Sequence, residues 1–418
     1  MTLIEELTWR GFVNQTTYTE EQLAKLNDQP VKFYWGVDPS ADSMTIGNLA
    51  AAMLVQHFIN HGHHAVLLIG GATGLIGDPD GKSKERDLKS FEEIEANKAK
   101  IIAQFHQLFD GHPFDTVDNY DWTKELTYIE FLRDIGKHIP LASMLGRDFV
   151  KSRLGEDGSG ISYAEFSYVL IQAYDFLRLY EDHQVTLQLC GSDQWGNSIA
   201  GVDLIRRKNG GEAHVFSTPL IVNKTTGQKF GKSETGAIWL DPQKTTPTQF
   251  YQFWINVDDE GVEDYLKIFT LLDKHAIDEI MAAHREQPGL RLAQKKLAHE
   301  VTRYVHGPDV TARATTITDI LIGQKKLSDI DDNTILEELR SEIPSVKTHP
   351  EAEIAEIMVQ VGLASSKTNA RELIAGNALS INGEKVTRDN FESGDFINDK
   401  LLLRRGKAFK DSALVEID

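Results

Sequence analysis

Short apolar runs recur along the first part of the chain, and each leads into a turn that contains glycine or proline. The runs are VKFYWGV (31–37), AVLLI (65–69) and VTLQLC (185–190). Helical periodicity dominates between them, as at 91–109 and 163–180. Strands that alternate with helices predict an α/β fold with a doubly wound parallel sheet. Ligands of such sheets bind beyond the carboxyl ends of the strands, where the three turns would gather.

The pattern changes near residue 245, where the strand signal fades. Helical periods continue to about residue 325, and a polar stretch with two prolines follows. After about residue 352, two helical periods precede LSINGEKV and LLLRRGKAFK, and the Asn-Gly pair in the first of these predicts a hairpin. We therefore expect an α/β domain at 1–222, a helical domain at 223–325, a linker at 326–351 and a small α+β domain at 352–418.

Composition and charge narrow the classes of protein that the chain can represent. Its single cysteine, Cys190, excludes an internal disulfide and zinc sites built from cysteine pairs. The formal net charge of −19 argues against non-specific coating of nucleic acid, so any such contact must come from a local basic patch. No apolar run reaches about eighteen residues, and the acidic N-terminus does not resemble a signal peptide. We therefore expect a cytoplasmic protein that does not enter a membrane.

The glycine-rich loops do not match the common nucleotide-binding motifs. The glycines of GGATGLIG (70–77) lack the G-x-G-x-x-G spacing, which argues against a nicotinamide oxidoreductase. The segments 77–83 and 227–233 have three residues between their glycines, where the P-loop requires four. Their lysines and serines remain available as phosphate contacts.

One histidine pair and the cysteine have simple structural interpretations. In HFINHGHH (57–64), His57 and His61 are four residues apart, as a helical metal site would require. We expect this run to be exposed at a helix end, and no acidic residue lies nearby in sequence. We therefore expect no metal site. Cys190 ends an apolar run and is expected to be a small buried residue.

Residues 38–50 (DPSADSMTIGNLA) form a strand-to-helix corner that is rich in small and polar residues. A helix start offers free N–H groups and a dipole that favours an anion. Gly47 would let a ligand approach closely, while Thr45 and Asn48 would place polar groups at the mouth. An anion site and an ordinary N-cap with a proline turn fit this segment equally well.

The helical segment 163–180 carries a stripe of polar residues. Tyr168, Gln172 and Asp175 are spaced i, i+4, i+7 and share one helical face. Buried polar groups require partners, so this stripe predicts a polar pocket rather than plain core. A solvated face is the alternative, but neighbours such as Phe166 and Val169 leave little room for it.

Taken together, these segments resemble the bacterial tyrosyl-tRNA synthetases over essentially the whole chain. The matching segments are YWGVDPSADSMTIGNLA (34–50), GGATGLIGDPDGKSKER (70–86), EFSYVLIQAYDFLRLY (165–180), GSDQWGN (191–197) and KFGKSETGAIWLD (229–241). The resemblance implies a Rossmann-like catalytic domain and an α-helical anticodon-binding domain that follows the KFGKS loop. It also implies a C-terminal domain like the RNA-binding module of ribosomal protein S4.

The resemblance further implies a class I aminoacyl-tRNA synthetase, a ligase that activates L-tyrosine with ATP to tyrosyl-adenylate and pyrophosphate. The tyrosyl group would then pass to the 3′-terminal ribose of tRNA-Tyr. Mg²⁺ would accompany ATP, with no tightly bound protein metal, and catalysis would consist of positioning and charge stabilisation. The family is homodimeric, and the resemblance suggests the segment 135–155 as the interface.

Individual residues acquire roles from the same resemblance. Tyr34 and Asp175 would hold the phenol hydroxyl of tyrosine, Asp78, Tyr168 and Gln172 its ammonium, and Gln194 would lie near its carboxylate. The residues expected to bind ATP are Gly36, Asp38, Gly47, Gly191, Asp193, Lys232 and Ser233. Those expected to stabilise the reacting phosphates are Ser40, Thr45, Asn48, Lys82, Arg86, Lys229 and Lys232. The cluster expected to contact tRNA-Tyr is Arg404, Arg405, Lys407 and Lys410.

The chain departs from the family at the first signature, which normally reads His-Ile-Gly-His. Thr45 and Asn48 replace the two histidines, and Trp35 and Ala51 are unusual neighbours of the ribose. We hypothesise that Thr45 contributes less to activation than histidine would, so that Thr45→His would raise the activation rate. Two alternatives remain. Tryptophanyl-tRNA synthetase shares the fold, although Tyr34 and Asp175 suit a phenol better than an indole. A degenerate paralogue with an RNA-binding or regulatory role is the second.

Overall fold

The computed structural model describes residues 1–79, 88–146, 148–155, 160–227, 230–233, 236–330, 332–406 and 411–418. The chain divides into two compact units. The first comprises Met1–Thr245 and Val257–Leu297, and the second comprises Thr246–Asn256 and Ala298–Asp418. Among the described residues, no helix combines the length and the apolar character that crossing a membrane would require.

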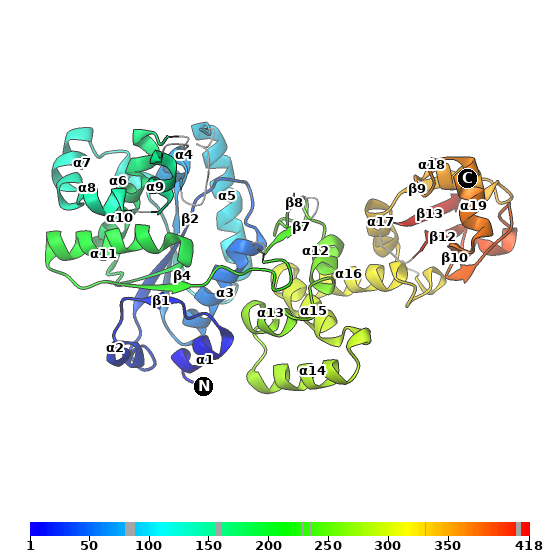
Figure 1. Ribbon diagram of the computed structural model, residues 1–418, viewed down its shortest axis with the longest axis horizontal. Helices are drawn as coiled ribbons and strands as arrows, with labels where there is room; N and C mark the ends of the chain where they lie inside the picture. The colour runs from blue at the N-terminus through cyan, green and yellow to red at the C-terminus, as the bar shows by residue number, and fades with distance from the viewer. Residues whose placement is uncertain are drawn as a thin grey trace. The chain divides into compact units, whose positions relative to one another are not determined.

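A six-stranded sheet organises the first unit (Figure 1), in the order β1-β6-β5-β2-β3-β4. Its strands are β1 (Gln15–Thr16), β2 (Lys32–Val37), β3 (His64–Ile69), β4 (Phe114–Asp118), β5 (Leu187–Gly191) and β6 (His214–Thr218). All neighbours are parallel except β1, which runs antiparallel to β6. The chain proceeds outward from β2 through β3 to β4 and returns to add β5 and β6 on the other side. The sheet therefore has its topological switch point between β2 and β5.

This sheet confirms the predicted α/β fold class and the three predicted strands. Strands β1, β4 and β6 were not predicted. The sequence of β4, FDTVD, is polar and only partly buried, so it shows no clear strand signal. The helices of the Rossmann-like region are α1 (Leu3–Arg10), α2 (Glu20–Lys25), α3 (Ile46–Asn60), α4 (Gly71–Ile76), α5 (Phe91–Leu108), α6 (Tyr120–Thr123), α7 (Tyr128–Asp134), α8 (Leu141–Leu145), α9 (Asp148–Leu154), α10 (Tyr163–His183) and α11 (Trp195–Asn209).

Strand β2 distributes its side chains between the two faces of the sheet. Phe33 packs against Phe58 of α3, and Trp35 packs against Phe105 of α5, with ring centroids 5.3 and 5.6 Å apart. Tyr34 points to the opposite face, where it joins a core built by α10 and α11. Because side chains alternate along a strand, neighbouring residues of β2 serve two different walls.

The remainder of the first unit follows the sheet in sequence. It contains the short strands β7 (Lys232–Ser233) and β8 (Gly236–Ala237) and the helices α13 (Val262–Phe269) and α14 (Lys274–Glu286). Arg10 ties α1 to this part, because its guanidinium donates to the backbone oxygens of Lys267, Thr270 and Leu272 at 2.7–3.0 Å. Such multiple charged donors satisfy carbonyls that would otherwise lack partners at a helix end.

The second unit combines helices with a five-stranded sheet. Its helices are α12 (Pro247–Ile255), α16 (Pro308–Leu321), α17 (Asn333–Glu342), α18 (Ile354–Gln360) and α19 (Lys367–Ala375), while α15 (Leu292–His306) contributes residues to both units. The sheet has the order β11-β10-β12-β13-β9. Its strands are β9 (Ser345–Thr348), β10 (Leu379–Ile381), β11 (Glu384–Lys385), β12 (Lys400–Arg405) and β13 (Ser412–Ile417).

Two sequence expectations meet this sheet. The hairpin is confirmed, since β10 and β11 pair across Asn382 and Gly383, whose φ angles of 50° and 90° suit a tight primed turn. The expected linker at 326–351 contains α17 and β9, and β9 pairs in parallel with β13. Leu336 and Leu339 of α17 also share a core with Leu402 and Leu414 of the sheet.

Candidate active site

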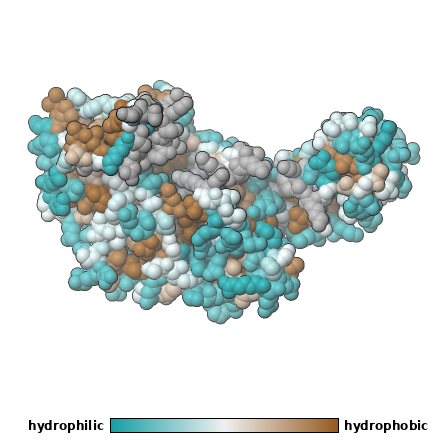
Figure 2. All heavy atoms as spheres, in the orientation of Figure 1, coloured by the Kyte–Doolittle hydropathy of each residue, from teal (hydrophilic) through white to brown (hydrophobic). Residues whose placement is uncertain are grey.

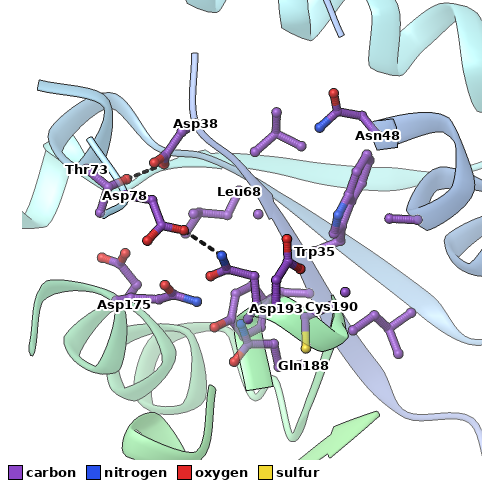
Figure 3. Close-up of a pocket in the computed structure, with 18 of the residues that line it drawn as sticks. Trp35, Asp38, Asn48, Leu68, Thr73, Asp78, Asp175, Gln188, Cys190 and Asp193 are labelled. Atoms are coloured by element: carbon purple, nitrogen blue, oxygen red, sulfur yellow. Dashed lines mark hydrogen bonds between the residues drawn. The ribbon is translucent and has the colours of Figure 1, made fainter. Parts of the chain in front are cut away.

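A cavity of about 270 Å³ opens at the carboxyl ends of β2 and β5 (Figure 3). This is the switch point at which a doubly wound sheet leaves a crevice for ligands. The lining residues are Tyr34, Trp35, Gly36, Val37, Asp38, Ser40, Gly47, Asn48, Ala51, Leu68, Thr73, Asp78, Tyr168, Gln172, Asp175, Gln188, Leu189, Cys190, Gly191, Asp193 and Gln194. The cavity thus brings together the residues that the resemblance implied for binding the substrate tyrosine and most of those that it implied for binding ATP.

One end of the cavity holds a buried carboxylate between two donors. The Nδ2 group of Asn119 and the Nε1–H of Trp122 each donate to one oxygen of Asp175, at 2.9 Å. Burial nevertheless raises the pKa of Asp175 to about 7, against the lowering effect of those two hydrogen bonds, while Asp38 and Asp118 raise it further. Tyr34 lines the same cavity and is 2% exposed.

The Tyr34 hydroxyl has no hydrogen-bond partner among the described residues. Burial, and then the charge of Asp175, raise the pKa of Tyr34 well above its usual range, so its O–H stays a donor. A buried hydroxyl without a partner is costly, which indicates that a ligand supplies one. The Oε1 atoms of Gln172 and Gln188 are likewise without partners among the described residues.

A chain of hydrogen bonds runs from Asp175 along the wall of the cavity. Asn119 also donates to Oγ1 of Thr73 at 3.0 Å, and Thr73 donates to Asp38 at 2.6 Å. The hydroxyl of Tyr168 donates to the second oxygen of Asp38 at 2.7 Å. This network joins β2, α4, α10 and the segment after β4, so it fixes several lining groups at once.

The middle of the cavity brings together two distant segments. Gln194, which ends the 3₁₀ turn after β5, donates from Nε2 to Asp78 at 2.5 Å, and Figure 3 shows this bond across the cavity. Asn197 donates to the Oε1 atom of the same glutamine at 3.0 Å. Asp78 and Gln194 therefore form one polar wall, although 116 positions separate them in the chain.

The start of α3 forms the side of the cavity where the resemblance implies ATP. Ser40, Gly47 and Asn48 line it, whereas Thr45 does not. The hydroxyl of Thr45 donates instead to Oδ1 of Asn48 at 3.1 Å. The expected contact of Thr45 with a phosphate stays a prediction, and the hydrogen bond that the structure gives its hydroxyl goes to a neighbouring side chain.

The segment after the second signature pairs with the first signature. The N–H of Ile46 donates to the oxygen of Ile238 at 3.1 Å, and the N–H of Leu240 donates to the oxygen of Met44 at 2.9 Å. Strands β7 and β8 precede this contact and pair with each other. Lys82, Arg86 and Lys229 lie outside the described residues, as do the side chains of Lys232 and Ser233, so their expected phosphate contacts stay predictions.

Sequence reasoning missed Asn119, Trp122 and Thr73. Asn119 is fully buried and directly follows β4, so the carboxyl end of that strand contributes to the site. An alternating strand signal at 114–118 would have identified it, but the polar sequence gives none. Trp122 lies one turn further on, where an isolated tryptophan carries no specific pattern.

Cys190 and His57 are both buried side chains. Cys190 is buried as expected, and burial raises the pKa of its thiol to about 12, which leaves it unreactive. The expected exposure of His57 is wrong, because its side chain is buried and its Nδ1 lies 3.5 Å from Glu6 of α1. Glu6 is remote in sequence, which is why the carboxylate was not anticipated. Burial lowers the pKa of His57 to about 3.

The expected tRNA contacts differ in their surroundings. Arg405 donates to the backbone oxygen of Leu363 and to the carboxylate of Asp411, at 2.9 and 2.5 Å. Its guanidinium is therefore bonded to residues of its own unit. Arg404 points to the other face of β12, where it lines a small cavity with Lys325 and Lys326. Lys407 and Lys410 lie outside the described residues.

Comparison with known proteins places the chain in a class and then in a family. Residues 26–322 match the family described as "tRNA synthetases class I (W and Y)", and residues 335–410 match the "Tyrosine--tRNA ligase SYY-like C-terminal domain". The fold is therefore that of a class I aminoacyl-tRNA synthetase.

Curated relatives resolve the family. The chain is 46% identical to "Tyrosine--tRNA ligase 2" of Bacillus cereus, with 100% of both chains covered. It is 44% identical to "Tyrosine--tRNA ligase" of Geobacillus kaustophilus, covering 97% of this chain and 98% of that one. The chain belongs to the tyrosyl-tRNA synthetase family and is a tyrosine–tRNA ligase by this membership.

Solved structures agree with the assignment. A C-terminally truncated mitochondrial tyrosyl-tRNA synthetase of Aspergillus nidulans aligns with a TM-score of 0.68 and 31% identity, over 75% of this chain and 92% of that one. A tryptophanyl-tRNA synthetase of Encephalitozoon cuniculi aligns with a TM-score of 0.54 at 15% identity, which indicates a shared fold alone.

Proposed function

We infer that this chain activates L-tyrosine with ATP to tyrosyl-adenylate and pyrophosphate, and then transfers the tyrosyl group to the 3′-terminal ribose of tRNA-Tyr. One observation carries the choice of amino acid. The closed end of the cavity offers a buried hydroxyl donor, Tyr34, beside a buried carboxylate acceptor, Asp175. A phenol hydroxyl accepts one hydrogen bond and donates another, so it satisfies both groups.

The same end of the cavity argues against phenylalanine as substrate. Phenylalanine would fill the space but leave the Tyr34 hydroxyl and the Asp175 carboxylate buried without a ligand partner. Unsatisfied buried polar groups cost about 1–3 kcal/mol each, and more when they are charged. Discrimination therefore arises in this pocket from hydrogen bonding rather than from size.

The ammonium of the substrate would lie between Asp78, Tyr168 and Gln172. Tyr168 donates its proton to Asp38, so the lone pairs of its oxygen remain available to an ammonium N–H. Asp78 supplies charge, and Gln172 supplies an amide oxygen that lacks a partner among the described residues. An ammonium has three N–H donors, which matches these three acceptors.

ATP would occupy the side of the cavity formed by β2, the start of α3 and the loop after β5. We propose that Gly36, Asp38, Gly47, Gly191 and Asp193 bind the nucleoside and that Ser40 and Asn48 approach the phosphates. Asp193 can accept hydrogen bonds from ribose hydroxyls, and the glycines allow close approach of the ligand. The basic side chains of both signature loops would neutralise pyrophosphate as it leaves.

Mg²⁺ would enter with ATP. Among the described residues, no group of three His, Cys, Asp or Glu side chains could hold a metal ion by itself. Mg²⁺ commonly keeps several waters and binds through substrate phosphates and one or two carboxylates. We propose that Asp38, Asp78 and Asp193, which line the cavity, supply the carboxylates that could bind this ion. The ion would reduce repulsion between the tyrosine carboxylate and the α-phosphate.

We propose that the enzyme is a homodimer and that it acts in the cytoplasm. Figure 2 shows apolar residues gathered over one part of the first unit. The exposed large apolar side chains on α7 to α10 are Tyr128, Ile129, Leu132, Leu141, Leu145, Leu154 and Tyr163. Exposed apolar side chains that gather on one surface can mark a subunit interface, and several of these lie in the expected interface at 135–155.

Amino-acid-dependent exchange of labelled pyrophosphate into ATP tests the proposed function. We expect exchange with tyrosine and little or none with phenylalanine or tryptophan. Charging of tRNA-Tyr by the same preparation tests the second step. If folded protein binds tyrosine but supports no exchange, the degenerate alternative replaces this proposal.

A further inference from the structure

The orientation of the Asn48 amide is fixed by Thr45. Oδ1 of Asn48 accepts from the backbone N–H of Thr45 at 3.0 Å and from its hydroxyl at 3.1 Å. A backbone N–H can only donate, so the atom that it meets is the amide oxygen. The NH₂ group must therefore face the other way, and Figure 3 shows the nitrogen of Asn48 on the side of the cavity.

The backbone of Thr45 is held in place by a neighbouring segment. It forms a β-bridge with Trp239, and backbone hydrogen bonds hold the residues on both sides of it to the segment 238–240. It occupies the N-cap position of α3, with an extended backbone conformation. This anchoring lets its hydroxyl serve as a rigid second donor to the amide, because the backbone beneath it is held by a neighbouring segment.

We propose that Thr45 is a positioning residue, which locks Asn48 so that the amide NH₂ donates to an oxygen of bound ATP. This proposal rests on the proposed function. It replaces, for position 45, the direct phosphate contact that the family signature implies. Thr45 and Asn48 therefore act as one unit, in which only the asparagine touches the nucleotide.

The test is a double-mutant cycle in the full-length enzyme, measured by tyrosine-dependent pyrophosphate exchange. Thr45→Val removes the hydroxyl but keeps the branched shape and the backbone N–H. We expect kcat to fall about three- to tenfold, the value of one hydrogen bond, with KM for tyrosine unchanged. Thr45→Ser should restore most of the loss, because the hydroxyl returns.

The cycle is closed with Asn48→Ala. If Thr45 acts only through Asn48, the double variant Thr45→Val/Asn48→Ala should be no slower than Asn48→Ala alone. Thr19→Val is the matched control, since Thr19 caps α2 and its backbone N–H donates to the amide oxygen of Gln22, outside the cavity. Should Thr45→Val fold poorly, Thr45→Ala provides a second deletion of the hydroxyl.

Several results would overturn the inference. Equal rates for Thr45→Val and wild type would show that the hydroxyl is not needed. Additive losses in the double variant would show that Thr45 acts independently of Asn48, as a direct phosphate ligand would. An equal loss in Thr19→Val would reduce the effect to helix capping. Absence of exchange in the wild type would overturn the proposed function together with this inference, whereas the other outcomes leave that function intact.

Discussion

In the proposed function, selectivity for tyrosine depends on single atoms at the end of the cavity that holds Asp175. Asn119 and Trp122 occupy one lone-pair direction on each oxygen of Asp175, so the remaining directions are those that a ligand can use. Tyr34 faces the same space from the central strand. None of these groups moves a proton in the proposed reaction, and their effect is to define which hydroxyl fits.

The raised pKa of Asp175 predicts a pH-dependent affinity for tyrosine. An ionised carboxylate accepts a stronger hydrogen bond from the phenol than a protonated one does. Because burial places the pKa of Asp175 at about 7, affinity should fall as the pH is lowered below 7, by up to about tenfold per unit. Calorimetric titration of tyrosine between pH 5.5 and 8 measures this, and Asp175→Asn should flatten the profile. A wild-type profile that is equally flat would contradict the prediction.

The same shift has a consequence for stability. The carboxyl of Asp175 ionises near its ordinary pKa in the unfolded chain and only near 7 in the folded, ligand-free protein. Its contribution to the free energy of unfolding is therefore present below the ordinary pKa and is lost as the pH rises towards 7 and beyond. Bound tyrosine would offset this loss.

At the scale of elements, the position of α10 depends on its packing against α11. Helix α10 carries Tyr168, Gln172 and Asp175 on one face and turns Phe176 towards α11. A Cβ atom added at Gly201 would lie 2.9 Å from the Cβ of Phe176, which is closer than real contacts allow. The glycine therefore sets the distance between the two helices.

Gly201→Ala should disturb both stability and substrate binding. Overpacking of this kind costs about 1–3 kcal/mol. Alanine gains about 1 kcal/mol over glycine in helix propensity, so the overpacking cost outweighs the gain over most of its range. We expect a lower free energy of unfolding in urea and a higher KM for tyrosine, because α10 must shift. Gly289→Ala is the control, since Gly289 is exposed with open space around its Cα. Equal behaviour of the two variants would contradict this account.

At the scale of the whole molecule, the first unit carries the exposed apolar side chains of α7 to α10, and the second carries the candidate RNA contacts. We propose that tyrosine activation uses residues of the first unit, because every described lining residue of the cavity belongs to it. Transfer to tRNA requires a further surface. We therefore propose that activation takes place in the first unit and that transfer to tRNA also requires the second.

The apolar patch predicts that charge will dissociate the dimer. Ile129 is 68% exposed and Leu141 is 60% exposed, so neither supports the core of its own unit. Ile129→Glu/Leu141→Glu should give a monomer in light scattering after size exclusion, because burying two carboxylates at an interface is costly. Leu271→Glu, which changes an exposed leucine outside the patch, should leave the mass unchanged. A wild-type monomer would refute the proposed dimer.

Removal of the C-terminal part should separate the two reactions. We expect a chain that ends at about residue 350 to retain pyrophosphate exchange and to lose tRNA charging. The cut also removes Leu402 and Leu414 from the core that they share with α17. A point variant that leaves this core intact is therefore a second, independent test. Arg404→Ala is that variant, and it should slow charging while exchange persists. Charging that survives both changes would contradict the assignment.

Local patterns along the chain predicted three strands of the main sheet, the polar stripe on α10 and the family signatures. Each depends on local spacing, since alternation, helical periodicity and contiguous motifs are readable along one segment. The resemblance then supplied roles for lining residues such as Tyr34, Asp78 and Asp175. The same local logic failed at β4, because a polar edge strand shows no clear alternation.

How distant residues come to share a partner follows only from their arrangement in space. Asn119 and Trp122 meet Asp175 because the carboxyl end of β4 lies beside α10, and His57 meets Glu6 because α1 covers the end of α3. The direction of the Thr45 hydroxyl was equally invisible, because a signature shows which residue is present and not which atom it contacts. Hydrogen bonds between segments depend on orientation in space, and no spacing along the chain encodes that orientation.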